Sequence, residues 1–291
     1  MSHGAVPRAG IIDAHHHLWR RERHPQPWID PVSMAAIDAD FVHADLAAEA
    51  EPAGVTGTVV VQSIHSEAET TDLLSVASRS ELIKGVVGWV DFAAPDTADR
   101  VGRLRATRGG GKLVGIRHLV QDEPDPAFLE RSAIRRAVAA IGDAGLVFDL
   151  VCRHQQLPAV IGLVESLPQV SFVLDHLGKP PLAGQELRGW AGHLRTLARL
   201  PNVSAKLSGL VTEANWSSWT PADLKPAVAH ALDTFGPARL MFGSDWPVCL
   251  LATTYLDWIE VLRDLLAGCD EHQRQQIWRE TALRVYQLAE S

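Results

Sequence analysis

The stretch LVFDLVCRHQQLPAVIGLVESLPQVSFVL, residues 146–174, contains the pattern that decides the fold. It begins with an almost wholly apolar run at 146–150 and ends with another at 171–174. Between them, apolar residues recur every three to four positions over 157–167, which is typical of an amphipathic helix. Short runs that are apolar throughout predict buried parallel strands. The stretch therefore predicts a strand, a helix and a second strand parallel to the first.

The same alternation continues in both directions along the 291 residues. Helical spacing of apolar residues also appears at 127–144, 187–200, 222–235 and 255–266. The predicted strands are the eight runs at 11–13, 56–61, 85–90, 113–116, 146–150, 171–174, 203–207 and 240–242. Eight buried parallel strands that alternate with helices predict an α/β fold, the (β/α)8 TIM barrel.

A doubly wound open sheet is the alternative architecture. Two features weigh against it: no G-x-G-x-x-G follows the first strand, and polar residues follow nearly every run at its carboxyl end, where a barrel gathers its site. The glycine cluster at 109–111 is too short for a linker, so we expect residues 1–291 to form a single domain. Residues 270–287 are expected to form an extra helix outside the barrel.

Composition and charge exclude several classes of protein. The chain has 35 acidic and 27 basic residues, a net charge of −8, and its basic residues are scattered, so we expect no nucleic-acid partner. Residues 1–10 hold no apolar run, and no stretch approaches the roughly 20 apolar residues that span a bilayer. Three cysteines without a C-x-x-C pair favour a reducing compartment, and we expect a cytoplasmic protein. The sequence carries no signal for an oligomeric state.

Three consecutive histidines follow the first predicted strand. Side chains alternate faces along a strand, so His15 and His17 are expected to point to one side and His16 to the other. Two neutral imidazoles converging at a barrel mouth suit a divalent cation such as zinc. The alternative is a chance cluster whose rings bond to the backbone.

Asp245 follows the last predicted strand, within LMFGSDWP at 240–247. The first and last strands are neighbours once a barrel closes, so Asp245 is expected near His15 and His17. There it can be a metal ligand, a general base for a water molecule, or both. The alternative is structural, because an Asp before a turn often accepts hydrogen bonds from backbone amides.

Further polar residues follow other strands. We expect His176, within VLDHLGKP at 173–180, to polarise a substrate oxygen or hold the water, while Lys179 is either solvated or in contact with substrate. Arg117 follows the fourth strand and suits an anion or a row of sugar-like hydroxyls. Lys206 in the seventh strand either pairs with a carboxylate or points into the lumen. Weaker candidates, each with a surface or packing role as the alternative, are Gln62, His65, His154 and Trp28.

Taken together, His15-x-His17, His176 and GSDWP at 243–247 resemble the amidohydrolase superfamily. The stretches 13–19, 173–180, 206–214 and 240–250 are similar to its sugar-lactonase branch, the families of L-fucono-1,5-lactonases and L-rhamnono-lactonases. The resemblance runs from the first predicted strand to the last. It implies a (β/α)8 hydrolase that opens an aldonolactone or another small lactone in sugar or aromatic-acid catabolism.

The resemblance also implies a metal and a mechanism. One divalent ion, zinc, would be held by His15, His17 and Asp245 with a fourth position open to water. Some lactonases of this branch work with the histidines alone, so a metal-free reaction is the alternative. Many superfamily members carry a carboxylated lysine after strand four and a histidine after strand five, whereas this chain has Arg117 and then His118 after strand four, and His154 lies well beyond strand five.

In the expected reaction, a water molecule activated by Asp245 attacks the lactone carbonyl. The metal, or His15 and His17 directly, stabilises the oxyanion, and His176 completes the cage. The side chains expected to orient the substrate are Arg117, His118 and Lys206, with Trp28, His65 and Lys179 as further contacts.

Two other functions fit the same barrel. A metal-dependent, non-oxidative decarboxylase would release carbon dioxide, and a barrel that only binds a sugar acid would be stabilised by ligand without turnover. The sequence favours lactone hydrolysis, because KLSGL at 206–210 and WPVC at 246–249 match the lactonase branch more closely. It does not identify which lactone is the substrate, because specificity depends on loop shape.

Overall fold

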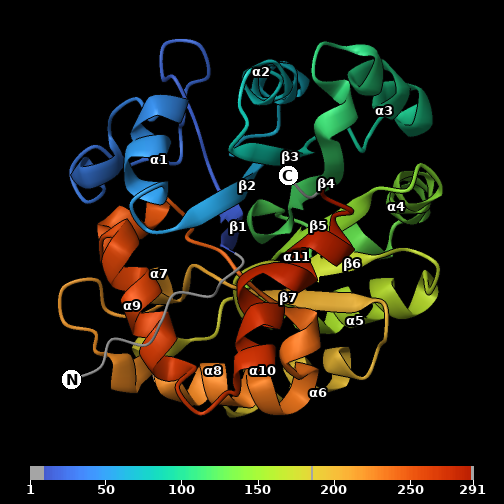
Figure 1. Cartoon of the computed structure of the whole chain (residues 1–291). Coiled ribbons are helices and arrows are strands. Elements are labelled where there is room, and N and C mark those ends of the chain that lie inside the picture. The colour runs from blue at the N-terminus through green and yellow to red at the C-terminus, as the bar shows by residue number, and fades with distance from the viewer. Residues whose placement is uncertain (1–9, 185, 290–291) are drawn as a thin grey trace.

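Eight parallel strands form one sheet in chain order, from β1 to β8. Figure 1 labels β1 to β7 around the barrel. The computed structural model describes residues 10–184 and 186–289. The stretch 1–9, where no apolar run is expected, lies outside the described residues. The strands are β1 Ile11–His16, β2 Val55–Val61, β3 Ile83–Gly88, β4 Leu113–Leu119, β5 Val147–Val151, β6 Phe172–Leu174, β7 Val203–Leu207 and β8 Leu240–Phe242. Each overlaps a predicted run, so the predicted (β/α)8 barrel is confirmed.

Helices lie between the strands and cover the outside of the barrel (Figure 1). They are α1 His43–Ala50, α2 Glu67–Ala77, α3 Thr97–Ala106, α4 Ser132–Asp143, α5 Leu157–Ser166, α6 Arg188–Ala198, α7 Leu210–Glu213, α8 Pro221–Phe235 and α9 Tyr255–Leu265. The helix predicted from residue 127 begins later, because Arg131 has an extended backbone that separates α4 from the short turn Phe128–Glu130. Among the described residues, no helix is long and apolar enough to cross a membrane.

The barrel closes where β8 meets β1. The backbone amide of Asp245 donates to the His15 carbonyl at 2.8 Å, and that of His17 donates to the Trp246 carbonyl at 2.7 Å. The buried Asp13 carboxylate also links β1 to the turn after β8, because it accepts a hydrogen bond from the Ser244 amide at 2.8 Å. This closure brings the ends of the first and last strands together, as their sequence positions predict.

The carboxyl-terminal segment covers the opposite end of the barrel. It consists of α10 Glu271–Gln275, the π-helical turn η10 Gln276–Glu280 and α11 Thr281–Val285, which together contact β1 and β8. Arg284 donates to the carbonyl of Ala238, just before β8, so the segment lies at the amino ends of the strands. We expected a helix outside the barrel over 270–287. The segment instead lies across one mouth, and Tyr286 packs with the lumen residues Ile12 and Met241.

Candidate active site

His15, His17 and Asp245 meet at the carboxyl end of the barrel. The Nε2 atoms of the two rings lie 3.3 Å apart, and Asp245 Oδ1 lies 3.6 Å from His15 Nε2 and 3.5 Å from His17 Nε2. All three side chains are buried. His16 points the other way and contacts the Thr58 hydroxyl at 3.0 Å, as strand alternation predicts.

The hydrogen bonds of both rings leave Nε2 directed into the site. His17 Nδ1 donates to the Val61 carbonyl at 2.8 Å, so its Nε2 is free to face Asp245. On His15, Nδ1 lies 3.3 Å from the Asp175 carboxylate and 3.1 Å from the Lys206 ammonium, while the Arg117 guanidinium lies 3.3 Å from Nε2. For His17, a protonated Nδ1 that donates to a carbonyl and a bare Nε2 form the tautomer in which histidine binds metal through Nε2.

His176 faces Asp245 from the loop after β6. Its Nε2 lies 3.9 Å from Asp245 Oδ1, and its Nδ1 lies 2.8 Å from the Ser208 hydroxyl. Gly209 lies against this ring with a φ of +61°, and a Cβ atom there would collide with the His176 imidazole. The loop after β7 therefore needs glycine at this position, both for its backbone conformation and for the space that the ring occupies.

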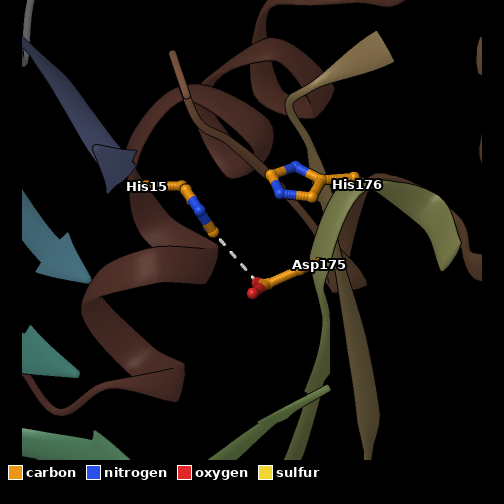
Figure 2. Close-up of side chains that lie close together, drawn as sticks. All are labelled: His15, Asp175 and His176. Carbon is orange, nitrogen blue, oxygen red and sulfur yellow. Dashed lines mark ion pairs between the residues drawn. The ribbon is translucent and has the colours of Figure 1, made fainter. Parts of the chain in front are cut away.

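A buried network of charges lies directly below the histidines. Figure 2 shows the His15 ring and the Asp175 carboxylate pointing toward one another, with His176 beside them. Asp175 also accepts from Arg117 at 3.0 Å and lies 2.9 Å from the Lys206 ammonium. Lys206 donates to Asp149 at 2.6 Å. Lys206 is therefore paired with two carboxylates inside the barrel, one of the two alternatives that the sequence leaves open.

Burial and neighbouring charges set the protonation states. Burial lowers the pKa of His15 well below its usual value and that of His176 to about 4, so both rings are neutral at pH 7. Burial would raise the pKa of Asp245, but the surrounding imidazoles of His176, His17 and His15 outweigh it and hold that pKa well below its usual range. The site thus presents the neutral imidazoles of His15 and His176 beside an ionised carboxylate.

His17, His176 and Asp245 line a cavity of about 330 Å³. The charged side chains at the rim of this cavity form ion pairs. Lys179 lies 3.2 Å from Glu213, and Arg153 lies 3.7 Å from Asp122. A larger cavity of about 570 Å³ lies between α1 and α2, but neither Asp245 nor His176 lines it. Predicted site residues that line the smaller cavity are His17, Trp28, Arg117, His176, Lys179 and Asp245.

The structure does not bring His65 and His118 to this cavity. Their rings stack 4.2 Å apart, and the backbone amide of Leu119 donates to His65 Nε2 at 3.1 Å. His118 contacts Glu123 at 2.6 Å through Nε2. Because successive residues of β4 point to opposite sides, Arg117 faces the lumen and His118 faces away from it.

Two weaker candidates also lie apart from the cavity lining. His154 is half-buried at the start of the short turn His154–Gln156 and belongs to neither potential metal-binding group. Gln62 is buried, and its side-chain amide donates to the Arg117 carbonyl at 3.2 Å. Neither side chain lines the cavity.

Sequence reasoning missed several residues at the site. Asp175 and Asp149 are the counter-charges of Lys206, and the signal for both was a carboxylate in or directly after a buried strand. Arg153 and Trp216 line the cavity from the loops after β5 and β7. Loop residues of this kind show no periodicity, so only their position after a strand could have indicated them.

The residues present fit a divalent ion. Among the described residues, two buried groups have ligand atoms within 4.8 Å of one another: His15, His17 and Asp245, and His15, Asp175 and His176. In the second group, Asp175 is already paired with Arg117 and Lys206. The first combines two imidazoles with a carboxylate, a donor set typical of catalytic zinc.

Comparisons with known proteins agree with this geometry. The family model described as amidohydrolase matches residues 12–288. An L-fucono-1,5-lactonase of Burkholderia multivorans is 38% identical over 96% of each chain, and one of Burkholderia ambifaria is 36% identical over 90% of this chain and 91% of its own. A crystal structure of a Burkholderia multivorans amidohydrolase with bound zinc superposes with a TM-score of 0.91 at 37% identity, covering 97% of this chain and all of that one. The chain therefore belongs to the amidohydrolase family.

Proposed function

We propose that this protein is a lactonase that opens L-fuconolactone or a related sugar-acid lactone. The observation that carries the proposal is the Asp245 carboxylate, which lies 3.5–3.9 Å from three imidazoles at the mouth of the barrel. The similarity to two L-fucono-1,5-lactonases supports the substrate class. A role in carbohydrate catabolism follows from this substrate class.

His15, His17 and Asp245 would hold one divalent ion, and zinc suits two imidazoles and a carboxylate. Such an ion would supply Lewis-acid polarisation of a carbonyl oxygen or a water molecule. The zinc in the similar Burkholderia multivorans structure supports this assignment.

Asp245 is the proposed base. It is ionised at neutral pH, so its carboxylate can accept a proton from the water that attacks the lactone carbonyl carbon. The bond between that carbon and the ring oxygen then breaks, the ring oxygen takes up the proton, and the product is an open hydroxy acid. His176 is held by Ser208 and faces Asp245, so it can orient the water or the carbonyl oxygen.

The cavity rim is proposed to orient the sugar ring. Lys179 and Arg153 are each near a carboxylate, so they offer hydrogen bonds without a strong net positive charge. Trp28 and Trp216 line the same cavity and offer apolar faces to the ring carbons. This combination suits an uncharged, polyhydroxylated ring. Lys206 and His118, which lie away from the cavity lining, are assigned to support of the site instead.

A cytoplasmic location is part of the proposal. Cys152, Cys249 and Cys269 are free and buried thiols, which agrees with the reducing compartment that the sequence favours.

A pH-indicator screen tests the proposal, since each hydrolysis releases one acid. The substrates are L-fucono-, L-rhamnono-, D-arabinono- and D-galactono-lactone, each tried with chelator-treated and zinc-supplied protein. We expect turnover of at least one of them. Turnover of none, or release of carbon dioxide from an aromatic acid instead, would contradict it.

A further inference from the structure

Tyr286 reaches into the barrel from the end opposite the cavity. It follows α11, is 2% exposed, and packs among lumen side chains that include Ile12, Val147 and Met241. Its hydroxyl donates to Asp149 Oδ2 at 2.7 Å. The carboxyl-terminal segment therefore places a hydroxyl group against a buried carboxylate inside the barrel.

A continuous chain of polar contacts leads from this hydroxyl to His15. Asp149 Oδ2, which accepts from Tyr286, also accepts from the Lys206 ammonium at 2.6 Å. That ammonium lies 3.1 Å from His15 Nδ1. It also lies 5.4 Å from the centre of the Tyr286 ring, within the range of a cation–π contact. Asp149, Lys206 and His15 are all 0% exposed, so water does not substitute for a lost partner.

The position of Lys206 depends on two competing carboxylates. Its ammonium lies 2.6 Å from Asp149 and 2.9 Å from Asp175, and Asp175 in turn faces His15 Nδ1 at 3.3 Å. The Tyr286 hydroxyl and the Lys206 ammonium donate to the same oxygen, Asp149 Oδ2, so each donor reduces the negative charge that the other meets. Without that hydroxyl, the ammonium would shift toward Asp149 and away from Asp175. The contact between Lys206 and His15 Nδ1 would then change, and the ring would be held less firmly.

We propose that Tyr286 is a positioning residue for the active site, which acts through Asp149 and Lys206 to fix the orientation of the His15 ring. The inference rests on the proposed function for its kinetic consequence, but the ring orientation itself can be measured without substrate. If the role of Tyr286 were purely structural, its aromatic ring alone would close the end of the barrel. Removal of the hydroxyl would then leave the His15 ring unchanged.

The deciding variant is Tyr286→Phe, which keeps the ring and its apolar contacts and removes only the hydroxyl. The matched control is Thr281→Val in the same segment, because the Thr281 hydroxyl donates to the Ala238 carbonyl at 3.2 Å and has no contact with Asp149. Circular dichroism would confirm that both variants are folded at the temperature of measurement.

The first readout is the ring nitrogen resonances of His15 in protein labelled with 15N-histidine. They are assigned by their absence in His15→Asn. His230, whose Nε2 contacts the Ala191 carbonyl at 2.8 Å on the outside of the barrel, is an internal reference. The second readout is kcat and KM for a lactone that the wild-type protein hydrolyses.

In Tyr286→Phe we expect the His15 resonances to move while those of His230 do not. We also expect kcat to fall about tenfold while KM changes by no more than about twofold. This is the scale seen for groups that orient a metal ligand or a catalytic group. Thr281→Val should change neither readout. Unmoved His15 resonances, an unchanged kcat, or equal changes in Thr281→Val would each overturn the inference. If the wild-type protein hydrolyses no lactone, the proposed function fails, and the resonances alone decide whether Tyr286 orients His15.

Discussion

His17 and Asp245 face each other across the seam between the first and last strands, with Nε2 and Oδ1 3.5 Å apart. They are separated by most of the chain, yet two backbone hydrogen bonds between β1 and the turn after β8 hold them in register. The site therefore depends on closure of the barrel, because neither strand carries both groups.

Asp245→Asn tests the proposed base. The amide cannot accept a proton from water, so we expect kcat for lactone hydrolysis to fall by about 10² to 10⁴. Asp264→Asn, on the exposed side of α9, is the matched control and should retain full activity. Undiminished hydrolysis in Asp245→Asn would refute the assigned base.

His17→Asn tests the metal ligands. We expect its zinc dissociation constant, measured by isothermal titration calorimetry, to rise by more than the roughly tenfold cost of losing an outer partner of a ligand. His16→Asn is the matched control, because His16 is the neighbouring buried histidine and contacts Thr58 instead. Equal zinc affinities for the two variants would contradict the ligand set.

Lys206→Met tests the buried charge network. The substitution removes the ammonium that Asp149 and Asp175 share as a counter-charge. We therefore expect the free energy of unfolding to fall by about 3–5 kcal/mol. Urea unfolding measures the change, with Lys225→Met on the exposed side of α8 as the control. A loss no larger than that of the control would show that the network does not stabilise the fold.

Gly209→Ala tests the space around His176. The added Cβ would collide with the imidazole at a φ of +61°, so we expect a loss of stability of about 1–3 kcal/mol and a lower kcat. In Gly162→Ala, inside α5, a Cβ meets nothing within 4 Å, and stability should hold or rise. A fully active Gly209→Ala protein would mean that the ring is free to move.

We expect the stability of the protein to depend on pH through His118. Burial lowers its pKa from 6.5 to about 4, so between these values the unfolded chain binds a proton that the folded chain does not. Stability should therefore decrease as pH falls from 6.5 toward 4. In His118→Gln this decrease should be smaller, as measured by urea unfolding at several pH values. An identical pH profile in the variant would exclude this contribution.

The barrel and the core of the site could be predicted because both follow from short-range patterns. Strand periodicity predicts β1 and β8, and alternation separates His15 and His17 from His16. The same rule, applied to β4, would have separated Arg117 from His118. The partners of Lys206 could not be predicted, since Asp149 and Asp175 reach it from other strands and only the folded barrel shows which carboxylate faces which ammonium.

The segment from α10 to α11 lies across the amino ends of the strands, whereas the cavity opens at their carboxyl ends. Leu288 packs beside Gly85 near the start of β3, so this segment lies on the face away from the substrate entrance. Immobilisation of the enzyme on a solid support through an exposed side chain of this segment should therefore leave that entrance directed toward the bulk solution.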